Sequence, residues 1–116
     1  KLAWAADFCG VRSGRDTDKW KEARLTPVPG HAVKAPLIQE SPVSLECRVR
    51  QTLPLGSHTM FVAEVVSVSV DEAYMDKNNR FHLDKSSPIC YSHGRYYALG
   101  KEVGKFGYSV AKKKNK

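Results

Sequence analysis

The clearest pattern along the chain is a strict alternation of apolar and polar residues in residues 43–51. The apolar positions are Val43, Leu45, Cys47 and Val49, and the polar positions between them are Ser44, Glu46, Arg48 and Arg50. A period of two is typical of a β-strand with one buried face and one face in water. The pattern therefore predicts a strand that buries Leu45 and its apolar companions and leaves Glu46 in solvent.

A second apolar run, residues 58–70, has apolar side chains at both odd and even positions, and therefore on both faces of a strand. They include Phe61, Val62, Val65, Val66 and Val68. A strand of this kind is expected to be covered on both faces, as in the wall of a barrel. Because Pro54-Leu55-Gly56-Ser57 supplies turn chemistry between the two runs, we expect them to form an antiparallel pair. Shorter strands are expected at residues 89–91 and 96–99.

The N-terminal part has helical character. Residues 2–8 are mostly helix formers, and Gly10 is a natural stop. After the turn at residues 13–16, Thr17 is expected to cap a short helix over residues 18–23. Helices followed by a run of strands predict an α+β fold built on an antiparallel barrel.

The segment between helices and strands, residues 25–42, contains four prolines. Proline lacks a backbone donor and favours extended or turn conformations, so this segment is expected to be a surface connector.

A length of 116 residues suits one domain, and the net charge of +7 would attract anionic partners. Residues 112–116 hold much of this charge and are expected to be a disordered basic tail, which leaves residues 1–111 as the domain. Because this tail has no apolar residue to hold it to a core, no specific nucleic-acid partner is expected. No membrane partner is expected either, because no apolar run reaches the roughly twenty residues that span a bilayer. The first residues read as the middle of a helix, so we expect a segment before Lys1.

The potential metal ligands show no useful clustering. Cys9, Cys47 and Cys90 are widely spaced and odd in number, which predicts neither disulfides nor a metal site and indicates a reducing compartment, the cytoplasm. The remaining candidates are expected to be surface groups without partners; they are His31, His82, His93, Glu46, Glu64 and Asp71.

Several segments, in this order and spacing, resemble the C-terminal part of flavin reductase-like, FMN-binding split-barrel proteins of the flavoredoxin type. They are residues 6–14 (ADFCGVRSG), 18–20 (DKW), 25–27 (LTP), 35–38 (APLI), 45–47 (LEC), 55–59 (LGSHT), 62–65 (VAEV) and 95–100 (RYYALG). The resemblance implies an antiparallel split β-barrel of Greek-key type, here partial, preceded by short helices. The family's N-terminal strands and its basic loop at the flavin phosphate have no counterpart in this chain, so its N-terminal half is expected to be missing.

The resemblance also implies a function. Family members are normally homodimers that hold FMN near the subunit interface and move a hydride or electrons between NAD(P)H or a protein partner and FMN. The chain is thus expected to belong to an FMN-dependent oxidoreductase or an electron-transfer flavoprotein. The alternative is a non-catalytic dimerisation or binding module derived from a flavoprotein.

His58 is the expected catalytic residue. It matches a family histidine near the flavin edge and the nicotinamide, where an imidazole can hydrogen-bond or deliver a proton; the alternative is a turn histidine. The expected cofactor-binding residues are Ser13, Gly14, Lys19, Trp20, Ser57, His58, Thr59 and Tyr97. Plainer alternatives are a helix-to-helix turn for Ser13 and Gly14, a core tryptophan for Trp20, and one ring inward and one outward for Tyr96 and Tyr97.

Overall fold

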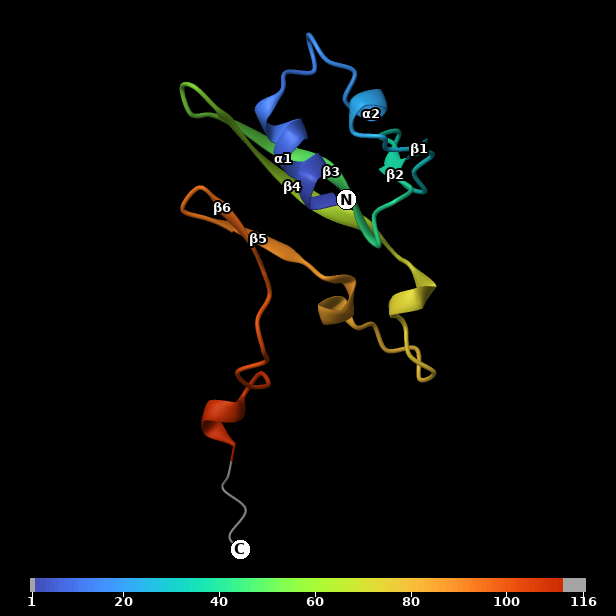
Figure 1. Ribbon diagram of the computed structural model, residues 1–116, viewed down its shortest axis with the longest axis vertical. Coiled ribbons are helices and arrows are strands. Elements are labelled where there is room, and N and C mark those ends of the chain that lie inside the picture. The colour runs from blue at the N-terminus through green and yellow to red at the C-terminus, as the bar shows by residue number, and fades with distance from the viewer. Residues whose placement is uncertain (1, 112–116) are drawn as a thin grey trace, which may run out of the picture.

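The computed structural model describes residues 2–111 and shows two helices followed by antiparallel hairpins (Figure 1). The helices are α1, Leu2–Val11, and α2, Lys19–Glu22. Both predicted helices are confirmed, but the predicted Thr17 cap is wrong. Asp18 caps α2, because its carboxylate accepts a hydrogen bond from the backbone N–H of Lys21 at 3.2 Å. The predicted basic tail, residues 112–116, lies outside the described residues.

The strands form three two-stranded antiparallel sheets. They are β1 (Pro27–Val28) with β2 (Leu37–Ile38), β3 (Val43–Pro54) with β4 (Thr59–Val70), and β5 (Ile89–Ser92) with β6 (Arg95–Ala98). Three short 3-10 helices follow the main hairpin: η1 (Glu72–Tyr74), η2 (Leu83–Ser86) and η3 (Tyr108–Val110). The β3–β4 hairpin confirms the predicted pair, and β5 and β6 confirm the two predicted shorter strands. The β1–β2 pair lies in the proline-rich connector, where no strand was predicted. Within residues 2–111 the sheets do not join into a closed barrel.

The β3–β4 hairpin breaks the strict alternation on which its prediction rested. Its register runs from Val43 opposite Val70 to Pro54 opposite Thr59, with irregularities between Glu46 and Cys47 and between Val49 and Gln51. At each irregularity one strand carries an extra residue, which bends and twists the hairpin locally.

The predicted burial of β3 is wrong in this chain. Leu45 is 58% exposed and Val49 is also exposed, whereas Glu46 is only 2% exposed. The loop between β1 and β2 covers the Glu46 carboxylate. Among residues 2–111 no comparable layer covers Leu45, so the predicted dry face is largely open. On the predicted wet face Arg48 and Arg50 are exposed as expected, and Glu46 is the exception.

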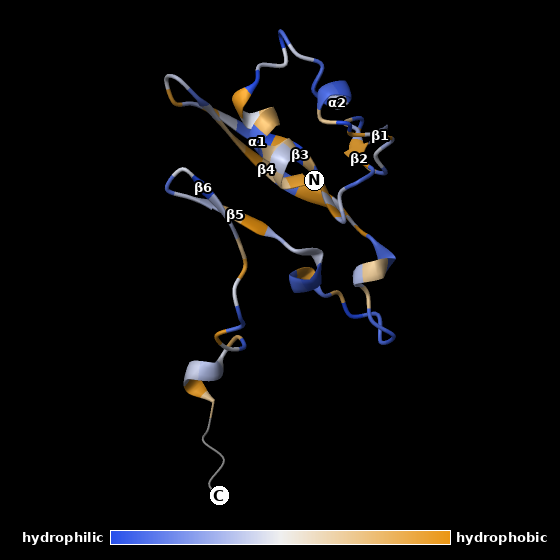
Figure 2. Cartoon of the chain, in the orientation of Figure 1, coloured by the Kyte–Doolittle hydropathy of each residue, from blue (hydrophilic) through white to orange (hydrophobic). Residues whose placement is uncertain are grey.

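The predicted two-sided cover of β4 is also wrong. Phe61, Val62, Val65 and Val68 are exposed, and Figure 2 shows apolar colouring along this hairpin with few elements around it. The described residues therefore present an apolar sheet surface to solvent.

Little of the described chain is fully buried. The buried apolar residues are Ala5 of α1 and Ala23 after α2. The radius of gyration is 18.2 Å, against about 13 Å for a compact chain of this length. Within residues 2–111 no helix combines the length and apolar character needed to cross a membrane.

Candidate functional site

His58 lies in the turn that joins β3 to β4, which we call the hairpin tip (residues 55–58). The Leu55 N–H donates to the His58 carbonyl at 2.8 Å, and Gly56 has a φ of 78°, a left-handed conformation that glycine adopts without strain. Ser57 Oγ and His58 Nδ1 share a hydrogen bond of 2.8 Å. This bond orients the ring, and Nε2 has no hydrogen-bond partner among the described residues.

Apolar side chains flank the hairpin tip. Leu53 lies opposite Met60, and Leu53, Leu55, Met60 and Phe61 are all exposed. A planar aromatic ring can rest on such side chains while the imidazole Nε2 meets its polar edge, the combination of apolar lining and few polar groups that ligand sites use. The adjoining Thr59 opens β4 opposite Pro54.

Ser13 and Gly14 lie in the turn between α1 and α2. The Ser13 hydroxyl accepts a hydrogen bond from the Arg15 N–H at 3.2 Å, and the Ser13 carbonyl accepts one from Asp16 at 3.3 Å. A hollow of about 290 Å³ beside this turn is lined by Phe8, Arg12, Asp16, Thr17, Asp18 and Glu22. Its carboxylates outnumber its single guanidinium, so the local charge does not suit a phosphate.

Lys19 and Trp20 tie α2 to its surroundings. Lys19 Nζ donates to the carbonyl of Cys9 at 2.6 Å. A cation near the C-terminal end of a helix is favourable, so this contact joins α2 to the end of α1. Trp20 is half-buried, and its carbonyl accepts a hydrogen bond from Leu25 at 2.9 Å.

Tyr97 lies on β6 opposite Cys90. The expectation of one ring inward and one outward is wrong, because Tyr96 and Tyr97 are both exposed. Partial burial, together with a hydrogen bond to Asp7, raises the pKa of the Tyr96 phenol.

The expected site residues thus occupy three separate places. Ser57, His58 and Thr59 form one group, and the segment from Ser13 to Trp20 forms a second; Tyr97 stands apart on β6. Figure 1 shows the hairpin tip and α2 on opposite sides of α1. No hydrogen bond found in the described part of the chain joins the three places.

Glu46 is the residue that sequence reasoning missed. Its Oε1 accepts hydrogen bonds from the backbone N–H groups of Ala32 at 2.8 Å and Val33 at 3.1 Å. The Ala32 bond, opposed by burial and supported by bonds from His31 and Val33, lowers the pKa of Glu46. Oε2 has no hydrogen-bond partner among the described residues. The alternating pattern gave no sign of this role, and the motif at residues 45–47, which contains Glu46, carried no interpretation of its side chain.

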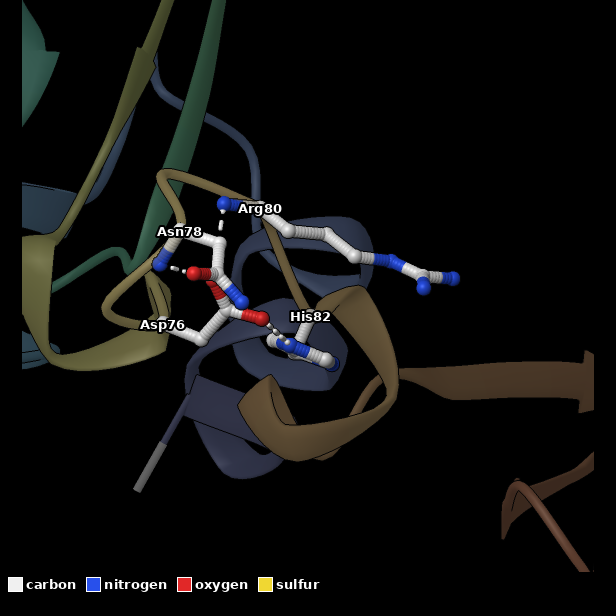
Figure 3. Close-up of polar contacts among 4 residues, drawn as sticks. All are labelled: Asp76, Asn78, Arg80 and His82. Atoms are coloured by element: carbon white, nitrogen blue, oxygen red, sulfur yellow. Dashed lines mark hydrogen bonds and ion pairs between the residues drawn. The ribbon is translucent and has the colours of Figure 1, made fainter.

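His82, another of the expected surface groups, has a partner in Asp76. Asp76 Oδ1 accepts from the N–H groups of Asn78 at 2.8 Å and Arg80 at 3.0 Å, and Oδ2 lies 2.8 Å from His82 Nε2 (Figure 3). The bond to His82 and those backbone bonds lower the pKa of Asp76 to about 2.

Glu64 forms an ion pair with Arg50 across the main hairpin, and Asp71 caps η1 through the Ala73 N–H. The prediction that these groups lack partners is therefore wrong.

The model of the flavin reductase like domain matches residues 2–100. The chain belongs to this family. An uncharacterized protein of Archaeoglobus fulgidus is 38% identical to this flavin reductase-like chain over 76 residues, which cover 66% of the chain and 41% of the relative.

Solved structures agree with this family membership. The flavoredoxin of Desulfovibrio vulgaris (Miyazaki F) superposes with a TM-score of 0.81 at 31% identity, over 92% of this chain and 58% of that one. The 2-nitrobenzoate 2-nitroreductase of Pseudomonas fluorescens shares the fold, with a TM-score of 0.76 at 16% identity, over 98% of this chain and 58% of that one. The flavin reductase-like chain spans about half the length of these relatives. The expected fold class, α+β of the antiparallel split-barrel type, is confirmed.

Proposed function

We propose that this flavin reductase-like chain forms the part of an FMN-dependent oxidoreductase or electron-transfer flavoprotein that presents His58 to the reacting groups. Hydride or electrons would move between NAD(P)H or a protein partner and FMN. The observation that carries the proposal is the family match over residues 2–100, with flavoredoxin 31% identical. The same proposal includes assembly as a homodimer. It also includes a cytoplasmic location, which the free cysteines suggest.

The geometry at the hairpin tip supports this role for His58. The hydrogen bond between Ser57 and Nδ1 orients the ring and leaves Nε2 open. When Nδ1 accepts from the Ser57 hydroxyl, Nε2 carries the proton and can donate to an anionic or carbonyl edge of a bound ring. The exposed Leu53, Met60 and Phe61 would cover the apolar part of that ring.

Bound FMN would supply the electron chemistry, and the protein would supply orientation and hydrogen bonding. Ser57 and His58 at the hairpin tip, with the adjoining Thr59, fit the ring end of the cofactor. The turn at Ser13 and Gly14 does not fit its phosphate, because Asp16, Asp18 and Glu22 line the adjacent hollow. Lys19, Trp20 and Tyr97 remain proposed contacts.

The test compares two histidines in hairpin turns. His58→Asn should slow reduction of bound flavin by about ten- to a hundredfold, if it removes about 1.4–2.8 kcal/mol of transition-state stabilisation. His93→Asn is the matched control: His93 lies in the β5–β6 turn, is exposed, and has a φ of 49° that asparagine tolerates. Stopped-flow reduction with NADH and with NADPH measures both variants. Equal rates for wild type and His58→Asn, with flavin bound, would remove His58 from the mechanism.

The alternative function is a non-catalytic binding module. The acidic hollow beside Ser13 favours this alternative, because its carboxylates would repel a phosphate. A visible absorption spectrum after titration with FMN separates the two functions. Bound flavin gives a yellow protein, whereas a chain that stays colourless at saturating FMN would overturn the flavin proposal.

A further inference from the structure

The Glu46 carboxylate is a buried negative charge without a full set of partners. Glu46 is only 2% exposed. Its Oε1 accepts from Ala32 and Val33, but within residues 2–111 Oε2 has no hydrogen-bond partner and is sealed from water by the surrounding atoms. In the same part of the chain no lysine or arginine side chain pairs with Glu46. A buried charge of this kind is strongly disfavoured unless a second charge compensates it.

Oxygen atoms gather around Gly30, beside this carboxylate. A Cβ on Gly30 would lie 2.7 Å from Glu46 Oε1, 2.7 Å from the Val33 carbonyl oxygen and 2.9 Å from the Ala35 carbonyl oxygen. Neither carbonyl accepts a backbone hydrogen bond from another described residue. These distances are too short for a carbon atom but near those of metal–oxygen bonds, about 2.3–2.6 Å for Ca²⁺. A carboxylate with carbonyl groups is the ligand set that hard cations take in proteins.

Charge and size narrow the choice of cation. The oxygens around Gly30 include one carboxylate and therefore one negative charge, which a monovalent ion neutralises, whereas calcium sites use several carboxylates and six to eight oxygen ligands. Because Oε2 is sealed from water, the ion must be smaller than a water molecule. Sodium meets this condition better than potassium, since selectivity between cations of one class depends on the size of the cavity.

We propose that Glu46 and the carbonyl groups of Val33 and Ala35 bind a sodium ion that fixes the β1–β2 loop against β3. The ion would lie among these oxygens, away from the Gly30 Cα, and would compensate the charge of Glu46. It would be enclosed as the loop closes over the strand, so its binding is coupled to the folding of this part of the chain. The site is built from residues 30–46 alone (Figure 1), so it depends neither on flavin nor on a second polypeptide.

Thermal melts in sodium, potassium and choline chloride of equal concentration test the site, because screening is then the same in all three. A chelator removes divalent ions, and about pH 8 keeps an exposed imidazole such as that of nearby His31 neutral. Sodium at about ten times Kd should favour the folded chain about elevenfold and raise the melting temperature of the wild type. Glu46→Gln, which keeps an acceptor for Ala32 but lacks the charge, should melt alike in all three salts. Glu64→Gln, at an exposed ion pair, is the control and should keep the preference for sodium.

Amide NMR spectra of the wild type provide a second measurement, which does not depend on a variant folding. When sodium replaces choline, the signals of Ala32 and Val33 should shift. Those of Asn78 and Arg80, which donate to the accessible carboxylate of Asp76, should stay in place. Unchanged signals at Ala32 and Val33, equal shifts at both carboxylates, a wild type that melts alike in sodium and choline, or a sodium preference that persists in Glu46→Gln would overturn the site. Both measurements are made without flavin, so their failure leaves the proposed function untouched.

Discussion

At the scale of single residues, the polar groups that matter are carboxylates held by backbone N–H groups. Glu46 accepts from the loop before β2, and Asp76 accepts from its own turn and lies against His82. A carboxylate that leaves water needs such donors, since without them its charged form is strongly disfavoured. The backbone bond from Ala32 is the main cause of the lowered pKa of Glu46. For Asp76 the bond to His82 is the main cause of the lowered pKa, and the backbone N–H groups of Arg80 and Asn78 add to it.

Asp76 should make the free energy of unfolding depend on pH in the acidic range. Its pKa falls from 3.8 to about 2 in the folded chain. A lowered folded pKa stabilises the fold above the unfolded pKa, so the stabilisation is lost as the pH falls from about 4 to about 2. Thermal melts across this range should show a shallower pH dependence for Asp76→Asn than for wild type. Asp84→Asn in the neighbouring η2 is the control, and equal slopes for Asp76→Asn and wild type would contradict the assignment.

At the scale of elements, the β1–β2 loop and β3 depend on each other. The loop supplies N–H groups to Glu46, and Glu46 in turn holds the loop against the strand. Gly30 allows this approach, because a Cβ there would lie 2.7 Å from Glu46 Oε1 and 2.7 Å from the Val33 carbonyl. The contact between the β1–β2 loop and β3 therefore requires a glycine at position 30.

Gly30→Ala should destabilise the chain by about 1–3 kcal/mol, the usual cost of forcing extra atoms into a packed site. Gly10→Ala is the matched control: Gly10 lies in α1, and its added Cβ would meet nothing within 4 Å. That change should stabilise the helix by about 0.5–1 kcal/mol, since alanine is the better helix former. Denaturant unfolding of both variants measures the contrast, and two changes of the same sign would refute the tight approach at Gly30.

Leu45→Ala tests which face of β3 is covered. With Leu45 exposed, the change in the free energy of unfolding should stay within about 0.5 kcal/mol, as for ordinary surface positions. Buried leucines cost about 2–5 kcal/mol on truncation. A loss in that higher range in chemical denaturation of the 116-residue chain would mean that another layer covers this face in solution.

At the scale of the whole molecule, the described chain is extended and rich in exposed apolar surface. Its extents are 64 × 37 × 29 Å, and exposed apolar residues occur on β3, β4, β5, β6 and in residues 103–110. Surface of this kind on a folded protein marks an interaction site. The described residues therefore leave apolar faces open to contact with other polypeptide.

The chain should bind the dye ANS at neutral pH. Exposed apolar surface enhances ANS fluorescence, and here the surface belongs to folded strands, so the far-UV circular dichroism should stay that of an α+β chain. The fluorescence per chain should fall as concentration rises, because association covers the dye sites. Fluorescence no stronger than that of the dye alone in dilute samples would contradict the exposed faces.

Local signals alone located most elements. The turn at Gly56 and Ser57 predicted the β3–β4 hairpin, and the runs at residues 89–91 and 96–99 predicted β5 and β6. The motif at residues 55–59 identified His58 as a candidate, and His58 lies in an exposed turn of the structure. These features depend on neighbouring residues, whose conformational preferences act over a few positions.

Burial was decided only in three dimensions. The alternation around Glu46 determined a strand, but which face is dry depends on what packs against it. The β1–β2 loop covers Glu46, while among residues 2–111 Leu45 is left exposed. The separation of the expected site residues into three places was likewise settled by the tertiary structure. Sequence by itself determined elements and their order, because those arise locally; partners across the chain depend on contacts that a one-dimensional pattern does not contain.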